Sequence, residues 1–351
     1  MERALFLAER GRGTTSPNPM VGAVVVSSAG VIVGQGAHIR PGGAHAEIAA
    51  LDMAGHQARG ATLYCTLEPC AHVGRTGPCV ERIVASGISR VVAAMIDPNP
   101  RVSGRGVDYL RDHGIEVTVG VGEAAAARLN APFVTWMTKR RPYVIAKSAV
   151  SADGFVGIAG ERALLTGDEA NRYFHRQRAE VDAIAVGAGT MLADDPQLTV
   201  RHVRRDRDLL RVVVDWRARV PAGARLFSTL PEGPVIMAVT REAAATRPEA
   251  LAALEAAGAT LELFDTPDIG ALLARLAERE VTLLLLEGGP SLQQAFFDAG
   301  VVDRVQRVES PKVLKEGIPA AAGFKPPHGV SRRVTTLGAD RLVEWDVHRT
   351  D

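Results

Sequence analysis

Four side chains in the first half of the chain are typical ligands and catalysts of a zinc site. His45 and Glu47 stand at the start of an expected helix, Cys70 directly follows an expected strand, and Cys79 comes nine residues later. One imidazole and two thiolates supply the three protein ligands that a catalytic zinc takes, which leaves a fourth position for water. We therefore predict a zinc site at His45, Cys70 and Cys79.

Glu47 is the predicted general acid and base of this site. A zinc ion lowers the pKa of a bound water towards neutrality and so generates a hydroxide nucleophile. A carboxylate then has to move protons from that water to the substrate nitrogen and the leaving amine. His45 and Glu47 lie about 200° apart on a helix, so both reach one ion only if the helix meets it with its N-terminal end.

The cysteine spacing differs from that of the usual zinc deaminases. Their signature places HxE before PCxxC, whereas eight residues separate Cys70 from Cys79. This insertion excludes the ordinary cytidine and tRNA-adenosine deaminase pattern. The remaining cysteine, Cys65, lies in an apolar strand and is interpreted as a core residue. An odd count of three cysteines argues against a disulfide framework.

Composition limits the classes of protein. A chain of 351 residues with 46% hydrophobic content suggests two packed domains, at about 150 residues per domain. A formal net charge of +1 argues against a large nucleic-acid interface. We expect neither a signal peptide nor a membrane span, because no apolar run approaches the ~18 residues that a span needs. We therefore expect a cytoplasmic protein with neither nucleic acid nor membrane as a partner.

Helices and strands alternate along the first half. We expect strands at 21–26, 31–36, 62–66, 90–95 and 115–119 and helices at 4–10, 46–55, 79–87, 107–114 and 123–128. This alternation predicts a three-layer α/β/α domain with a mostly parallel sheet. A basic segment with a proline at 139–142 marks the boundary, which gives domains of 1–142 and 143–351.

The second half predicts another α/β domain. We expect strands at 143–149, 183–186, 210–215, 235–240, 281–286, 304–309 and 342–348 and helices at 168–178, 248–257, 269–278 and 291–299. Two junctions of the strand–glycine–helix type, at 185–190 and 287–291, allow close backbone approach and favour phosphate. Each junction is a weak signal by itself, since most are tight turns.

Longer motifs carry a family resemblance. They are PNPMVG at 17–22, HAE at 45–47, TLEPCAH at 66–72, GRT at 74–76, DPNP at 97–100, GRG at 104–106, KSAVSADG at 147–154, GAGT at 187–190, LADDP at 192–196, LTVR at 198–201 and EGGP at 287–290. The pattern resembles the bifunctional deaminase–reductases of riboflavin biosynthesis. The resemblance implies a cytidine-deaminase-like domain followed by a dihydrofolate-reductase-like domain, with Zn²⁺ and NADPH as cofactors.

The resemblance also implies two reactions. The first is deamination of 2,5-diamino-6-ribosylamino-4(3H)-pyrimidinone 5′-phosphate. The second is NADPH reduction of the ribosyl side chain of 5-amino-6-(5-phosphoribosylamino)uracil to ribityl. The implied partner is thus a small phosphorylated pyrimidine, and the implied assembly is a homo-oligomer, either a dimer or a tetramer.

Site residues carry over where the motifs match. In the first domain the resemblance implies substrate contacts from Asn18, His38, His72 and Arg75. In the second it implies a catalytic pair, Lys147 and Asp194, and substrate contacts from Arg178 and Arg201 to the phosphate, Glu287 to a hydroxyl, and Leu198. For NADPH it implies Val150, Leu164, Thr190, Asp194, Gly289, Pro290, Ser291, Leu292 and Gln293.

The second domain departs from the family pattern at four positions. The family often has a small hydroxyl residue where this chain has Arg162, and an aromatic residue where it has Leu164. It frequently has a serine in place of Trp216 and usually a glycine in place of Lys315. An alternative hypothesis is therefore an active deaminase joined to a non-catalytic reductase-like module. A further alternative is a deaminase of nucleic acids or nucleobases, which the low net charge disfavours.

Overall fold

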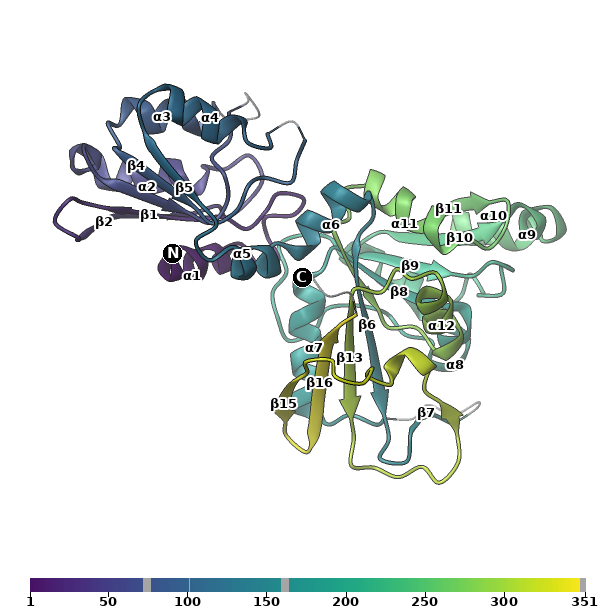
Figure 1. Ribbon diagram of the computed structural model, residues 1–351. Coiled ribbons are helices and arrows are strands. Elements are labelled where there is room, and N and C mark those ends of the chain that lie inside the picture. Colours follow the sequence, from purple (N-terminus) through teal and green to yellow (C-terminus); the bar gives the residue numbers. More distant parts are fainter. Residues whose placement is uncertain (72–76, 101, 159–163, 348–351) are drawn as a thin grey trace. The chain divides into compact units, whose positions relative to one another are not determined.

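The computed structural model describes residues 1–71, 77–100, 102–158 and 164–347. The chain divides into two compact units, Met1–Arg141 and Pro142–Asp351 (Figure 1). Three residues named above, His72, Arg75 and Arg162, lie outside the described residues.

A five-stranded sheet in the order β2-β1-β3-β4-β5 forms the centre of the first unit. Its strands are β1 (Gly22–Val26), β2 (Ile32–Ala37), β3 (Thr62–Cys65), β4 (Arg90–Ala93) and β5 (Glu116–Val119). Its helices are α1 (Glu2–Ala8), α2 (Ala46–Ala54), α3 (Cys79–Ala85), α4 (Arg105–Asp112), α5 (Glu123–Leu129) and α6 (Ala131–Lys139), with 3₁₀ turns at Glu9–Gly11 and Gly55–Ala58. Strands β3, β4 and β5 pair in parallel, whereas β1 is antiparallel to both of its neighbours. The sheet is therefore mixed rather than mostly parallel.

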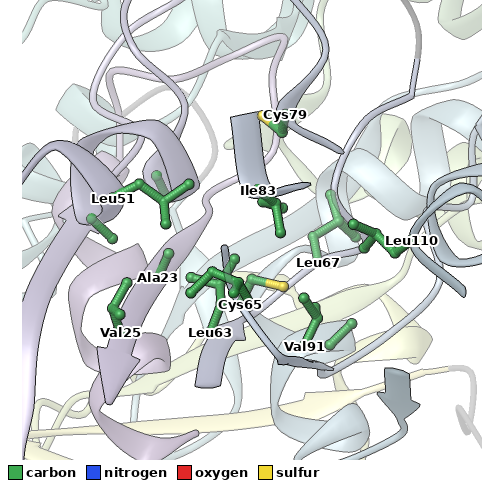
Figure 2. Packing of buried hydrophobic residues seen from close by; sticks show 14 of the residues in the cluster. Ala23, Val25, Leu51, Leu63, Cys65, Leu67, Cys79, Ile83, Val91 and Leu110 are labelled. Atoms are coloured by element: carbon green, nitrogen blue, oxygen red, sulfur yellow. The ribbon is translucent and has the colours of Figure 1, made fainter. Parts of the chain in front are cut away.

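Alternating side chains of the strands place helices on both faces of this sheet. On one face Val25, Leu63 and Cys65 pack with Leu51 of α2 and Ile83 of α3 (Figure 2). On the other face Val24 packs with Ala4 and Leu7 of α1. The interpretation of Cys65 as a core residue is confirmed, because its side chain is fully buried in the first cluster. The predicted three-layer arrangement is confirmed too.

Two glycines bring α2 against strand β2. A Cβ atom at Gly34 would lie 2.1 Å from the carbonyl oxygen of Ala50, and one at Gly36 would lie 2.2 Å from that of Ala46. The strand and the helix backbone thus touch without side chains between them. Because His45 immediately precedes α2, this contact also fixes the helix end that carries the predicted metal ligand.

The second unit is built on a nine-stranded sheet in the order β11-β10-β9-β8-β12-β6-β13-β16-β15. These strands are β6 (Tyr143–Val150), β8 (Ala183–Gly187), β9 (Leu210–Val214), β10 (Val235–Thr240), β11 (Ala259–Phe264), β12 (Leu283–Leu286), β13 (Arg304–Glu309), β15 (Arg333–Leu337) and β16 (Asp340–Asp346). A separate pair joins β7 (Phe155–Gly157) to β14 (Ile318–Pro319). All neighbours in the large sheet are parallel except β16, which is antiparallel to β13 and β15.

Helices cover both faces of this sheet as well. They are α7 (Asp168–Glu180), α8 (Ala188–Asp194), α9 (Arg241–Thr246), α10 (Pro248–Ala256), α11 (Ile269–Glu278) and α12 (Pro290–Asp298), with 3₁₀ segments at Arg225–Glu232 and Ala322–Phe324. Phe174 of α7 packs against Val308 of β13 on one face. Leu273 of α11 and Phe296 of α12 pack against Val305 and its cluster on the other.

Replacing Gly36 by alanine should destabilise the first unit by about 1–3 kcal/mol. The added carbon would meet backbone atoms of Ala46 and Ala50 at 2.2 and 2.7 Å, so the helix has to move away from the strand. Urea unfolding of both proteins measures the difference. Gly223→Ala is the matched control, since a Cβ there meets no described atom within 4 Å. Equal stability of Gly36→Ala and the control would contradict the close packing.

Candidate active sites

The structure brings His45, Cys70 and Cys79 together at one point. Nδ1 of His45 lies 3.1 Å from Sγ of Cys79 and 3.5 Å from Sγ of Cys70. All the possible ligand atoms of these residues lie within 4.8 Å of one another. His45 is the N-cap of α2 and Cys79 the first residue of α3, so both helices meet the cluster with their N-terminal ends. Figure 2 shows Cys79 at the end of α3, away from Cys65.

The electrostatics of this cluster fit a divalent cation. Hydrogen bonds, first with Cys79 and then with His45, lower the pKa of the Cys70 thiol to about 4 although burial opposes the shift. The same contact between the sulfurs, together with burial, raises the pKa of Cys79. The backbone N–H of Cys79 also donates to Sγ of Cys70, at 3.4 Å. Two crowded sulfurs beside an imidazole are the soft donor set that zinc prefers.

Glu47 lies in the first turn of α2, next to the cluster, and is 4% exposed. Burial, followed by the negative charge of Cys70, raises the pKa of Glu47 to about 7. A carboxyl group with a pKa near neutrality can both accept and release a proton, as general acid–base catalysis requires.

Asn18 and His38 form a hydrogen-bonded pair in the same unit. Nδ1 of His38 lies 3.1 Å from the carbonyl oxygen of Ala44, to which it must donate. Nε2 is then the acceptor for the Asn18 amide, at 3.1 Å. Burial lowers the pKa of His38, in agreement with this neutral form. The pair leaves Oδ1 of Asn18 to accept from a ligand, and the His38 ring stands edge-on to that of His45, with centroids 5.5 Å apart.

Glu68 has a role that the sequence analysis missed. Its carboxylate is 3% exposed and accepts backbone N–H groups of Asp97, Gly104, Gly106 and Val107, at 2.8–3.2 Å. Glu68 therefore fixes the loop that leads into α4. Glu68 itself lies two residues before Cys70 in the sequence. The motif TLEPC contains Glu68, but nothing in the sequence indicates which groups a buried carboxylate binds.

The second unit holds a pocket of about 350 Å³ where β6, β8 and β12 end. This is the edge at which open parallel sheets bind ligands. Among the residues predicted from the sequence, the lining includes Lys147, Leu164, Arg178, Thr190, Asp194, Leu198, Arg201, Glu287, Gly289, Pro290 and Gln293. Val150, Ser291 and Leu292 do not line it: Val150 is buried in β6, and Leu292 packs against Gly187 and Gly288.

Several lining residues were not predicted. They are Ser148, Ala149, Val156, Val186, Asp195, Pro196, Gln197, Thr199, Arg225 and Gly288. Arg225 follows β9 and lies far from every motif in the sequence, so no local signal could have found it. Its backbone N–H donates to Asp195, at 2.9 Å, which joins its segment to the pocket.

Arg178 and Glu287 pair with each other. Nε of Arg178 donates to Oε1 of Glu287 at 3.0 Å, and Nη2 donates to Oε2 at 2.6 Å. Burial alone would raise the pKa of Glu287, but the charges of Arg178 and Lys147 outweigh it and bring the pKa to about 2. Such a bidentate pair is rigid and charge-assisted, so the pocket has a fixed dipole on one wall.

Lys147 is half-buried in this pocket. Its Nζ lies 4.6 Å from the centroid of the Phe174 ring. Burial lowers its pKa, the carboxylate of Glu287 opposes that shift, and Arg178 adds to it. An ammonium with a lowered pKa is a better proton donor than an exposed lysine.

The glycine junctions fit a dinucleotide cofactor. Oγ1 of Thr190 accepts the N–H of Gly289 at 3.0 Å, which joins the start of α8 to the start of α12. The N-terminus of α12 opens at the pocket, where its N–H groups favour phosphate. Oε1 of Gln293 is buried without a partner among the described residues, while its Nε2 donates to the carbonyl of Lys147. A ligand amide or hydroxyl can satisfy that oxygen.

Of the departures from the family pattern that lie in the described part of the chain, two are outside the pocket. Trp216 packs on the core, edge-to-face with Phe264, and does not line the pocket. Lys315 has φ 69°, a left-handed conformation that explains why glycine suits this position. Its N–H donates to Asp153 at 2.7 Å, which holds the strained backbone. Leu164 does line the pocket, and it is exposed.

Comparison with known families defines the class of the chain. Residues 1–95 match the cytidine and deoxycytidylate deaminase zinc-binding region, and residues 142–328 match the RibD C-terminal domain. The chain is therefore a zinc-binding deaminase joined to a reductase. It belongs to the RibD family of riboflavin biosynthesis proteins.

Relatives support this assignment over nearly the whole chain. The RibD protein of Aquifex aeolicus is 42% identical over 91% of this chain and 88% of its own length, and that of Escherichia coli is 40% identical over 90% and 87%. The structure of Acinetobacter baumannii RibD has a TM-score of 0.84 at 34% identity and covers 99% of this chain and 98% of its own. A deaminase/reductase structure from Thermotoga maritima gives 0.84 at 34%, covering 99% and 97%.

These matches confirm the predicted family, fold class and enzyme type. The first unit is cytidine-deaminase-like and the second is the RibD C-terminal reductase domain, in a mixed α/β fold. The chain acts in riboflavin biosynthesis by deamination and reduction, and its deaminase unit carries the zinc-binding region of that family. The non-catalytic and nucleic-acid alternatives are not favoured. In the described part of the chain, every helix is too short or too polar to cross a membrane.

Replacing Glu68 by glutamine should destabilise the protein by about 2 kcal/mol. One carboxylate oxygen becomes an NH₂ group that faces N–H donors, so at least one buried donor pair is left unsatisfied. Thermal unfolding of the full chain measures the loss, with Glu81→Gln on the exposed side of α3 as the control. If the two variants melt alike, the four hydrogen bonds do not stabilise the loop.

Glu287→Gln should cost stability in a pH-dependent way. The folded-state pKa of Glu287 is about 2, below the ordinary glutamate value of 4.5. The ionised form therefore contributes stability above pH 4.5, and this stability is lost as the pH falls towards 2. This contribution is about 3 kcal/mol at pH 7 and less than half of that at pH 3. Urea unfolding at both pH values should show the wild type and the variant converging at low pH. A constant difference, as expected for exposed Glu249→Gln, would contradict the ion pair.

Proposed function

We propose that the deaminase domain, residues 1–142, hydrolyses the 2-amino group of 2,5-diamino-6-ribosylamino-4(3H)-pyrimidinone 5′-phosphate. His45, Cys70 and Cys79 would hold the zinc ion. Its chemistry at such a site is to make a water molecule acidic enough to act as a nucleophile near neutral pH. The observation that carries the proposal is the convergence of these three ligands beside the buried carboxyl of Glu47.

Glu47 would carry the protons of this reaction. Its carboxylate takes a proton from the attacking water and delivers it to the ring nitrogen, and a second transfer leads to departure of ammonia. Asn18, whose amide already donates to His38, would accept from the pyrimidine edge through Oδ1. His72 and Arg75, outside the described residues, remain predicted substrate contacts.

The reductase domain, residues 143–351, would reduce C1′ of the opened ribose of 5-amino-6-(5-phosphoribosylamino)uracil. NADPH supplies the hydride. In the ring-opened form C1′ is double-bonded to the 6-amino nitrogen. Nζ of Lys147 would donate the proton that this nitrogen takes up when hydride reaches C1′, with Asp194 as its polar partner, since both line the pocket. Gln293 and the glycine junction at 287–290 would hold the cofactor.

The phosphate and hydroxyl contacts of the substrate would come from Arg201, Arg178, Leu198 and Glu287. Nε and Nη2 of Arg178 already donate hydrogen bonds to Glu287. In this arrangement Glu287 orients Arg178, and Arg201 presents the freer guanidinium to the phosphate. The remaining cofactor contacts would be Val150, Leu164, Thr190, Pro290, Ser291 and Leu292.

Assembly and location are proposals that rest on the family resemblance. We propose a homo-oligomer, a dimer or a tetramer, that acts in the cytoplasm. Nucleic acid is not a proposed partner, because a net charge of +1 supplies little attraction for phosphate backbones.

A pair of variants tests the zinc site and the proton carrier. Cys79→Ser should lose most of its bound zinc, measured by metal analysis of purified protein. Glu47→Gln should keep its zinc but release ammonia at least about 100-fold more slowly, since it lacks the general base. Given 5-amino-6-(5-phosphoribosylamino)uracil, Glu47→Gln should still oxidise NADPH at the wild-type rate.

Cys65→Ala is the matched control, because this cysteine lies in the core and its variant should retain zinc. Unchanged zinc content in Cys79→Ser would remove Cys79 from the metal site. Wild-type ammonia release by Glu47→Gln would rule out its role as proton carrier. Absence of NADPH oxidation by the wild type would leave the reductase proposal without support.

A further inference from the structure

The loop that carries Arg201 is strained. Leu198 and His202 have φ values of 54° and 67°, in the left-handed region that residues with side chains rarely adopt. The loop lies between α8 and β9 and forms part of the pocket wall through residues 196–199 and Arg201. Such a backbone persists only when surrounding contacts hold it in place.

Two side chains from one face of α7 provide these contacts. His175 and Arg178 are three residues apart on the helix and so point in the same direction. Nη1 of Arg178 donates to the carbonyl oxygen of Thr199 at 3.3 Å. The two ring nitrogens of His175 lie 3.2 Å from the backbone N and from Nε of Arg201.

His175 is suited to accept these bonds. The side chain is 7% exposed, and its pKa is lowered to about 4 by burial and then by the positive charges of Arg178 and Arg201. The ring is therefore neutral and accepts at one nitrogen. Each neutral tautomer can accept one hydrogen bond from Arg201. When Nδ1 is the acceptor, the donor is the backbone N–H of Arg201, and when Nε2 is the acceptor, the donor is its Nε.

The contact leaves the outer end of the Arg201 guanidinium for a ligand. Nε faces His175, and among the described residues neither Nη1 nor Nη2 of Arg201 has a hydrogen bond or ion pair, although Arg201 lines the pocket. The neighbouring Arg178 is occupied by Glu287. We propose that His175 is a positioning residue for the reductase, which fixes Arg201 for the 5′-phosphate of the substrate.

This inference rests on the proposed role of Arg201 in binding phosphate. It adds a residue that touches neither substrate nor cofactor. If it acts through Arg201, its removal weakens the substrate phosphate contact and leaves the NADPH contacts and the hydride step unchanged.

Steady-state kinetics of the full-length protein test the proposal. His175→Leu should raise the KM for 5-amino-6-(5-phosphoribosylamino)uracil about tenfold. The kcat and the KM for NADPH should stay within about twofold of wild type. His175→Gln, whose amide oxygen is again an acceptor, should recover most of the loss. Arg176→Ala, on the exposed side of the same helix, is the matched control and should leave all three constants unchanged.

A double-mutant cycle separates the inference from the proposed function. If Arg201→Ala raises the KM and His175→Leu adds nothing in that background, His175 acts through Arg201. If the two effects multiply, the positioning role is overturned while the role of Arg201 stands. If Arg201→Ala leaves the KM unchanged, the proposed phosphate contact itself is wrong. Inhibition by inorganic phosphate, weakened in both single variants, gives an independent readout, and His175→Met replaces His175→Leu if the latter does not fold.

Discussion

Two sulfurs and one imidazole nitrogen within 4.8 Å of one another are the constraint on which the first unit depends. Three separate segments of the chain supply them, and two of these are held by contacts that have no chemical role. Gly34 and Gly36 let α2 touch β2, so that His45 sits at a defined helix end. Glu68 orders the loop beside Cys70. The chemistry of the ligands thus rests on backbone packing several residues away.

In the second unit the pocket depends on the compensation of buried charges. A pocket that receives a phosphorylated substrate and a phosphorylated cofactor needs cations, yet buried cations require compensation. The bidentate pair of Arg178 and Glu287 compensates one of them, and the Phe174 ring faces the ammonium of Lys147.

The sequence predicted those parts of the structure that local patterns specify. Helix 269–278 and strand 304–309 have the predicted bounds, because their apolar residues repeat clearly. Strand β11 and helix α6 were missed: β11 is a half-exposed strand with mixed side chains, and α6 lies beside the basic segment interpreted as a boundary. The antiparallel direction of β1 relative to β3 was also missed, because the direction of a strand depends on which distant strand it pairs with.

The site residues divide in the same way. Motif spacing indicated the cluster of His45, Cys70 and Cys79, and the family resemblance indicated about half of the pocket lining, because those residues lie in short runs next to strands and helices. Pairings across the chain had no such signal. Neither the contact of Arg178 with Glu287, 109 residues apart, nor that of His175 with Arg201, 26 residues apart, follows from any local pattern.

The four hydrogen bonds of Glu68, called the clamp here, also link the ordering of the loop to the binding of an ion. The loop that Glu68 binds contains none of the three ligands of the cluster, yet the clamp and Cys70 lie on the same short stretch of chain. Any free energy that a bound ion gives to this stretch is therefore shared with the loop, in the manner of thermodynamic linkage. Binding of an ion and ordering of the loop are therefore expected to stabilise each other.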